Sequence, residues 1–126
     1  SSDLFIINSN DADRMQVKQI VAIPSSTMIT LESNTRFLGN GSLSTTSACT
    51  TVIVSSNIYS TVLAGDNVSY TIDSTNYTAK IDAITNYLTN SHLTLASAPS
   101  QTASNVVYYV YPTMTGVAYG IINNLS

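Results

Sequence analysis

The chain has 126 residues, of which 44% are hydrophobic and only 9% are charged, and its net charge at pH 7 is −3. Four basic side chains are too few to neutralise a phosphate backbone, so a nucleic-acid partner is not expected. The longest apolar runs have the length of strands and fall far short of the roughly 20 residues that a membrane helix needs. No membrane span is predicted.

The surface is expected to be hydroxyl and amide rather than ionic, because 19 Ser and 17 Thr make up more than a quarter of the chain. Surfaces with few charges repel one another weakly and lose little hydration energy when they are buried. The composition therefore favours assembly. Cys49 is the only cysteine, which excludes an internal disulfide, and it is predicted to be a small buried hydrophobe.

In chain order, the predicted elements are all strands. No segment shows apolar residues at three- and four-residue steps over ten positions, the pattern of a helix. Short β-branched and aromatic runs are instead separated by Asn, Asp, Ser, Gly and Pro. Turns are predicted at 38–42 and 64–67. The predicted strands are residues 4–8, 15–23, 28–32, 50–55, 67–72, 76–84, 92–96, 105–111 and 117–122.

The pattern Ile-x-Ala-Ile, a polar gap and a closing Thr-Leu-x-Ser occurs twice, at 20–33 and at 81–97. The alignment also extends upstream and downstream of these segments, with a repeat of about 61–64 residues by direct comparison of the two copies. We infer a duplicated unit, with residues 1–58 as the first copy and 59–126 as the second. The predicted fold is all-β, with two related small antiparallel units that form tandem β-barrels or one β-sandwich.

Gly65 and Asp66 are predicted to shape the turn before the strand at 67–72. Gly65 can take a positive φ, and the Asp66 carboxylate can accept bonds from backbone N–H groups in the turn. These two residues also belong to a longer pattern in segment 51–97. It consists of a strand, a Ser/Thr segment, Leu-Ala-Gly-Asp-Asn-Val, a hairpin, Ile-x-Ala-Ile and Leu-Thr-Leu.

This pattern resembles a module of virion structural proteins of tailed bacteriophages. It departs from that module in having one residue between Leu63 and Gly65, and in having VSSNIY in place of a Gly-rich opening. The resemblance implies a non-enzymatic structural component of the virion that is assembled in the host cytoplasm. The favoured interpretation is a capsid decoration or cement protein, and a head- or tail-attached subunit is the nearest alternative. The implied partners are further copies and other virion proteins, such as major capsid or tail proteins.

Two apolar segments are predicted to form interfaces between subunits. Val107, Tyr109 and Tyr111 belong to a stretch that is apolar on both faces, so the strand is either central in the sheet or covered by another subunit. The run with Val117, Tyr119 and Ile121 either folds back beside residues 4–8 or adds to a sheet edge of an adjacent subunit. We favour the second arrangement for this run.

No catalytic constellation is visible, and no cofactor is predicted. Asp11 and Asp13 in the segment NSNDAD offer oxygen ligands of the kind that Ca²⁺ prefers. The segment lacks the Gly and the distant Glu of a helix-loop-helix calcium loop, so an Asx-rich turn is the preferred interpretation. His92 is the only histidine, which rules out a His-based metal cluster within one chain. It is predicted to be exposed or interfacial.

Two other functions stay open. Asn-x-Ser/Thr triplets begin at Asn40, Asn67, Asn76 and Asn124 and allow a glycosylated extracellular filament or surface-layer subunit, located at the cell surface. Chance alone gives about as many triplets in so Ser- and Thr-rich a chain, and two of them lie in predicted strands where a packed face would exclude a glycan. The clustered aromatic residues with Asn and Asp also allow a carbohydrate-binding or adhesin module.

Overall fold

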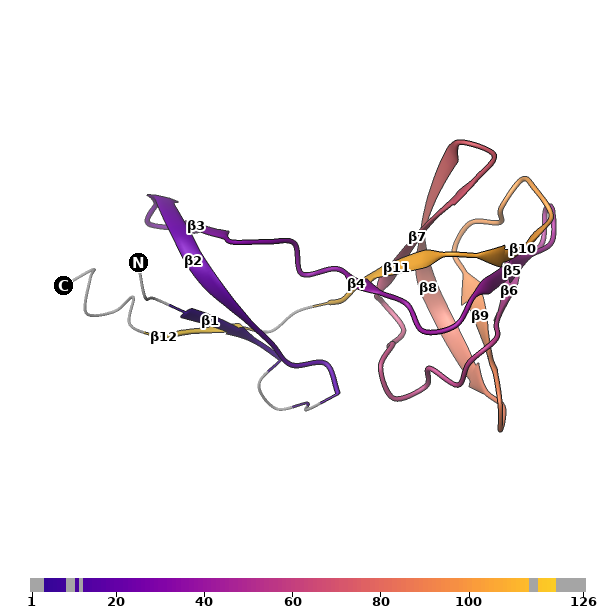
Figure 1. The fold of residues 1–126 in the computed structure, drawn as a ribbon, viewed down its shortest axis with the longest axis horizontal. Coiled ribbons are helices and arrows are strands. Elements are labelled where there is room, and N and C mark those ends of the chain that lie inside the picture. Colours follow the sequence, from indigo (N-terminus) through magenta and orange to yellow (C-terminus); the bar gives the residue numbers. More distant parts are fainter. Residues whose placement is uncertain (1–3, 9–10, 12, 114–115, 120–126) are drawn as a thin grey trace. The chain divides into compact units, whose positions relative to one another are not determined.

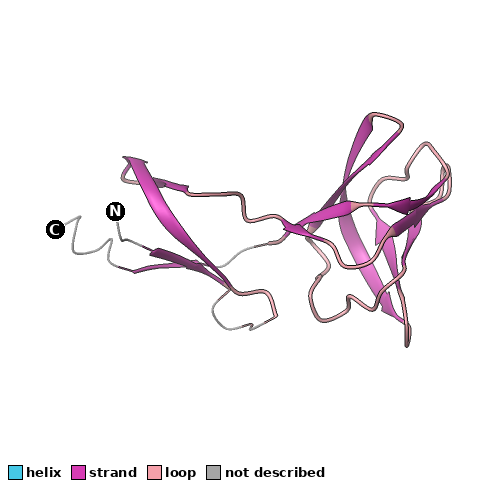
Figure 2. Cartoon of the chain, viewed as in Figure 1, coloured by secondary structure: helices cyan, strands magenta, loops and turns pink. Residues whose placement is uncertain are grey.

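The computed structural model describes residues 4–8, 11, 13–113 and 116–119. Figure 2 shows this part of the chain as strands joined by loops and turns, without a helix. The predicted all-β fold is therefore confirmed. The chain divides into unit 1, Ser1–Thr35 with Met114–Ser126, and unit 2, Arg36–Thr113. Unit 2 is thus inserted between two parts of unit 1, and the division falls elsewhere than the predicted boundary between residues 58 and 59.

Unit 1 is a four-stranded antiparallel sheet with the order β12-β1-β2-β3. The C-terminal strand β12 pairs with β1, so that Leu4 lies opposite Tyr119 and Ile7 opposite Gly116. The run at the C-terminal end therefore folds back within the chain, which corrects the favoured addition to an adjacent subunit. Pairing of β12 supplies hydrogen-bond partners to an edge of β1 that no other described strand covers. The strands are β1 (Leu4–Ile7), β2 (Gln16–Ser25), β3 (Met28–Leu31) and β12 (Gly116–Tyr119).

Unit 2 contains the other eight strands, in the order β10-β5-β6-β9-β8-β7-β11-β4. Only Val107 separates β10 from β11 along the chain, and β10 pairs with β5 while β11 pairs with both β7 and β4. The chain therefore passes directly from β10 at one end of the sheet order to β11 near its other end, and the sheet curls round its core as a small, barrel-like sandwich (Figure 1). The strands are β4 (Phe37–Leu38), β5 (Leu43–Thr45), β6 (Thr51–Val54), β7 (Asn67–Ile72), β8 (Thr75–Asn86), β9 (Ser91–Leu95), β10 (Ala103–Val106) and β11 (Tyr108–Tyr111).

Both units repeat one arrangement of four strands. The order β12-β1-β2-β3 in unit 1 corresponds to the stretch β11-β7-β8-β9 in unit 2, and every pairing is antiparallel. The registers correspond as well, because Phe5 lies opposite Lys18 as Val68 lies opposite Ala79. Each unit therefore contains the three-stranded meander that the sequence repeat predicts, with a fourth strand added beside the first.

The motif Ile-x-Ala-Ile marks an irregularity of the sheet in unit 1. Ile20 of β2 lies opposite Leu31 of β3. The next pair is Ala22 with Thr30, so β2 advances by two residues while β3 advances by one. Val21 is the extra residue, and such a β-bulge bends the strand and increases its twist.

The same motif marks the same irregularity in unit 2. Ile81 of β8 lies opposite Leu95 of β9, and the next pair is Ala83 with Thr94. Asp82 is the extra residue here, at the position that Val21 holds in unit 1. A shared bulge follows directly from duplication, whereas similar composition alone would not place it at one motif position in both units.

The hydrophobic core lies in unit 2, where burial of each Val, Leu or Ile stabilises the fold by about 1.5–3 kcal/mol. Tyr108 is the largest fully buried side chain, and its hydroxyl donates a hydrogen bond to the backbone carbonyl of Asn40. Burial raises the pKa of Tyr108 well above its usual range. Gly39 passes so close to this ring that a Cβ would overlap it. Among the described residues of unit 1, the buried hydrophobic side chains are Ile7 and Ile20.

Candidate functional site

One face of the unit 1 sheet is largely apolar and open to solvent. Residues that lie opposite each other on antiparallel strands share a face, so the pairs across β1, β2 and β3 define it. Leu4 is 38% exposed, Val17 49% and Met28 60%. Within the strands no member of this face is charged, and the exposed Glu32 follows directly after β3. We call it the outer face of unit 1; it consists of Leu4, Ile6, Val17, Gln19, Ala22, Ser25, Met28 and Thr30.

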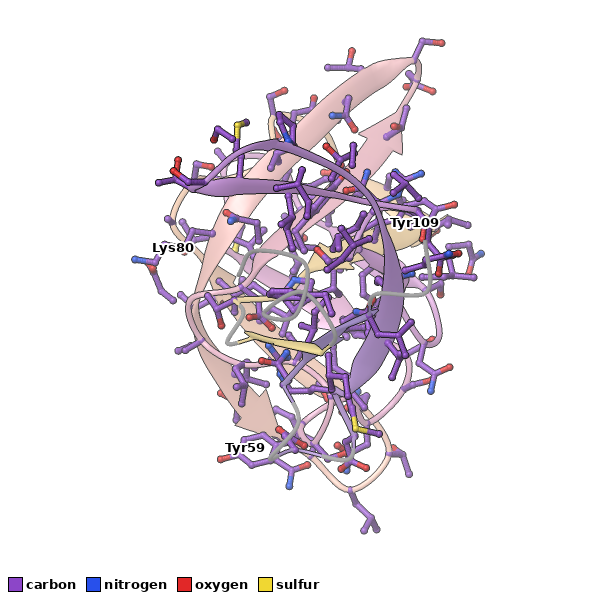
Figure 3. The ribbon with its side chains drawn as sticks, turned by 90° about the vertical axis from the view of Figure 1, so that its left-hand side faces the viewer. Tyr59, Lys80 and Tyr109 are labelled. Atoms are coloured by element: carbon purple, nitrogen blue, oxygen red, sulfur yellow. The ribbon has the colours of Figure 1, made fainter. Side chains whose placement is uncertain are left out.

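The corresponding face of unit 2 is polar. Ser69 takes the place of Ile6, Thr78 that of Val17 and Lys80 that of Gln19 in the aligned registers. Lys80 is exposed, and Figure 3 shows its side chain projecting away from the ribbon. The shared fold therefore does not require apolar residues at these positions. Exposed apolar faces of this kind are sites where proteins bind one another.

The structure places two of the predicted interface residues in β12. By register, Val117 lies opposite Ile6, and Tyr119 lies opposite Leu4. Their strand thus extends the sheet that carries the outer face of unit 1. Ile121, the third predicted residue of this run, lies outside the described residues.

The stretch with Val107, Tyr109 and Tyr111 is central in its sheet rather than at an edge. β11 pairs with β7 on one side and with β4 on the other. Val107 between β10 and β11 is 60% exposed, whereas both tyrosines are half-buried. The guanidinium of Arg36 lies over the Tyr109 ring, 4.4 Å from its centroid. Neighbouring strands thus account for much of the apolar character of this stretch, and an intersubunit role stays a prediction.

A hollow of about 540 Å³ with a mixed polar and apolar lining lies on unit 2, formed by residues of β7, β8, β10 and β11 and by Arg36. Arg36 and Asp73 bring opposite charges to it. The side-chain oxygen of Asn76 accepts hydrogen bonds from the hydroxyls of Ser69 and Thr71, at 3.2 and 3.3 Å. The lining offers hydroxyl, amide and charged groups, which suit a small polar ligand.

Asp66 fixes the turn that leads into β7. Its fully buried carboxylate accepts the backbone N–H of Leu63 at 2.9 Å, the role expected from the sequence. It also accepts the N–H of Thr113 at 2.8 Å and the Thr113 hydroxyl at 3.0 Å. Gly65 has a φ of +98°, as the turn requires. One carboxylate therefore ties this turn to Thr113, the last residue of unit 2, which the sequence did not predict.

Asp11 and Asp13 lie in a local turn. The carboxylate of Asp11 accepts the backbone N–H of Asp13 at 3.2 Å, and the backbone N–H of Arg14 bonds to the Asp11 carbonyl. This is the geometry of an Asx-rich turn. Within the described residues, no group of three or more His, Cys, Asp or Glu side chains is placed to hold a metal ion.

His92 and Cys49 are both half-buried. The His92 ring packs against Tyr87, with 4.4 Å between ring centroids, and His92 lies opposite Ile53 on β6 and Thr85 on β8. Cys49 is less enclosed than the buried position predicted for it, because it lies in the turn before β6 rather than in the core.

The Asn-x-Ser/Thr triplets within strands face solvent. Asn67 and Asn76 are exposed, because both belong to the outward-facing positions of β7 and β8. The expectation that a packed face would exclude a glycan there is therefore wrong. Asn40 is exposed as well, and Asn124 lies outside the described residues.

The outer face of unit 1 was not recognised in the sequence. The available signal was that β1, LFII, is apolar at every position, so both of its faces are apolar. No protein-family model, curated protein or solved structure matches this chain significantly. No helix in the described part of the chain has the length and hydropathy to cross a bilayer.

Proposed function

We propose that this protein is a non-enzymatic structural subunit of a tailed-bacteriophage particle that works by binding neighbouring protein subunits. The leading placement is on the capsid, as a decoration or cement protein, and a head- or tail-attached position is the alternative. The phage assignment comes from the resemblance of segment 51–97 to virion modules. The binding role is supported by the outer face of unit 1.

The contrast between the two units carries this proposal. Both units place the same strands in the same registers, yet Val17 and Ile6 stand in unit 1 where unit 2 has Thr78 and Ser69. An apolar outer face exposes hydrocarbon to water at a cost of about 25 cal/mol for each Å². Unit 2 shows that the fold is available without that cost. The apolar face of unit 1 therefore serves binding rather than folding.

Incorporation into particles tests the proposal. A tagged chain would be expressed during growth of the phage that encodes it, and purified particles would be separated on a density gradient. We expect the wild-type chain to sediment with the particles at a fixed stoichiometry, and Val17→Lys to lower its incorporation several-fold. Thr78→Lys is the matched control, because it adds the same charge at the equivalent position of unit 2. Absence of the wild-type chain from particles, or equal incorporation of both variants, contradicts the proposal.

The hollow of unit 2, which combines polar groups with apolar and aromatic side chains, favours carbohydrate binding as a second candidate function. Asn76, Asp73 and Arg36 present amide and charged groups there beside the hydroxyls of Ser69 and Thr71. Titration calorimetry against neutral and acidic oligosaccharides would check this function. Binding that is lost in Asn76→Ala and kept in Thr78→Ala supports it, and absence of heat with all sugars at millimolar concentration excludes it.

A further inference from the structure

β3 is the outermost strand of the unit 1 sheet within the described residues. Its counterpart in unit 2, β9, has a further neighbour: β6 pairs with it antiparallel, from Thr51 opposite Thr94 to Val54 opposite Ser91. No described strand of unit 1 takes the position that β6 holds in unit 2. The repeated unit therefore has an open strand position beside β3.

Burial of side chains locates the same open position. Leu93 and Leu95 of β9 are 0% and 1% exposed, because β6 helps to enclose them. Their counterparts on β3, Ile29 and Leu31, are only half-buried. Ile20, which lies opposite Leu31 one strand further in, is 2% exposed. Exposure of the inner face thus increases toward the edge that lacks a neighbour.

The backbone of β3 is also available at this edge. The N–H of Glu32 donates to the carbonyl of Gln19 on β2 at 2.9 Å. Backbone groups alternate in direction along a strand, so those of Leu31 and Ile29 point away from β2. An added strand could therefore form backbone hydrogen bonds with Ile29 and Leu31. Its own inward side chains would lie beside the apolar side chains of these two residues.

We propose that β3 from a second copy of this chain occupies the open position, so that two unit 1 sheets join edge to edge across a two-fold axis. This proposal deepens the proposed structural role and rests on it. The open position calls for an antiparallel strand with apolar residues at alternate positions, as β6 is to β9. β3 meets this description itself, with Ile29 and Leu31 on its inner face. Its four residues, Met28–Leu31, carry no charge that would repel a second copy.

The faces of the strand fix the register of this pairing. Opposite residues must share a face, because a shift by one residue would set the inner side chains of one copy against the outer side chains of the other. Ile29 of one copy then lies opposite Leu31 of the second, and Thr30 lies opposite Thr30 on the two-fold axis. Threonine pairs across antiparallel strands are favourable. The joined sheet also doubles the apolar outer face that we assign to binding.

The first test places a charge on the axis. Thr30→Lys sets two like charges directly opposite each other and should raise the dissociation constant of the dimer on the order of tenfold or more in sedimentation equilibrium. Ala22→Lys is the matched control, because Ala22 lies beside Thr30 on the same face but one strand further from the edge. It should leave the dimer nearly unchanged. A wild-type chain that stays monomeric up to near-millimolar concentration overturns the proposal, as does equal weakening by both variants.

The second test measures the register. Directly opposite residues on antiparallel strands have Cα atoms about 4.5–5.5 Å apart, within the range of a disulfide. In a Cys49→Ser background, Thr30→Cys should therefore form a disulfide-linked dimer under mild oxidation. Met28→Cys should not, because the two copies of residue 28 lie several residues apart along the joined strands. Equal crosslinking at both positions would mean random collision and would overturn the register and the proposal.

The two proposals fail separately. A chain that is monomeric in solution and still enters particles would refute the β3 pair and leave the structural role standing. A chain that dimerises through Thr30 and is absent from particles would support the pair and refute the role in the virion.

Discussion

Replacement of Asp66 should loosen the attachment of Thr113 to the turn before β7. Asp66→Ala removes a buried carboxylate that accepts three hydrogen bonds, from the N–H of Leu63 and from the N–H and hydroxyl of Thr113. Bonds to a charged acceptor contribute about 1.5 kcal/mol each at the low end, so the expected loss of unfolding free energy is about 4.5 kcal/mol. Asp66→Asn keeps one acceptor oxygen and nearly the same size, and should cost about 2 kcal/mol. Thr113→Val removes the hydroxyl alone and should cost about 1 kcal/mol.

Urea unfolding of the full chain measures these differences. The chain has no Trp, so tyrosine fluorescence and far-ultraviolet circular dichroism are the suitable signals. A loss of about 4.5 kcal/mol is a large part of the roughly 5–15 kcal/mol that holds a typical domain folded, so Asp66→Ala should shift the urea midpoint of unit 2 far below that of Asp66→Asn. If Asp66→Ala is no more destabilised than Thr113→Val, the carboxylate does not hold the turn in the way described.

Three further predictions concern unit 2. Gly39→Ala should destabilise unit 2 by about 3 kcal/mol or more, because the new Cβ overlaps the buried Tyr108 ring; an unchanged thermal midpoint would show that the ring can move aside. The pKa of Tyr108 is raised from 10.0 in the folded state, so its contribution to stability is full below pH 10 and is lost as the pH rises toward the folded pKa. Tyr108→Phe should therefore lose less stability than wild type between neutral pH and roughly pH 11 in urea unfolding, and parallel losses would refute this. Ser74→Gly should stabilise the chain by about 0.5–1 kcal/mol, because Asp73 and Ser74 adopt φ of +48° and +67° in a two-residue turn; the same change at Ser104 in β10 should not, and equal midpoint shifts would contradict the reasoning.

Local structure could be predicted where the alternation of side chains was regular. The predicted strand at 67–72 coincides with β7, because Val68, Tyr70 and Ile72 all face the core. The predicted strand at 105–111 is interrupted at Val107, since Asn105 has a φ of +57° and the chain bends there. β5, Leu43–Thr45, was missed because three residues with a single aliphatic side chain give no periodicity.

The partners of the strands were harder to predict than the strands themselves. The repeat in the sequence identified the meanders of both units, since each copy keeps its strands consecutive. Pairing of β12 with β1 joins residues that are more than a hundred positions apart, as Leu4 and Tyr119 are. No local pattern records such a contact, so unit 2 could not be recognised as an insertion. The outer face of unit 1 could not be predicted for a related reason. The sequence of an all-apolar strand such as β1 does not show which of its two faces is exposed to solvent.

The insertion of unit 2 into unit 1 determines how the chain would respond to a pulling force. Leu4 and Tyr119 lie opposite each other at one end of the β1–β12 pair, so tension applied at these two residues acts first on that pair. The ladder would open one hydrogen bond at a time, from Leu4 toward Ile7, which is the weak direction for a pair of strands. The chain passes between unit 1 and unit 2 at residues 35–36 and 113–114, and along the chain the tension reaches these two links once β1 and β12 have separated. Unit 2 is thereby shielded from extension by a small sheet that yields before it.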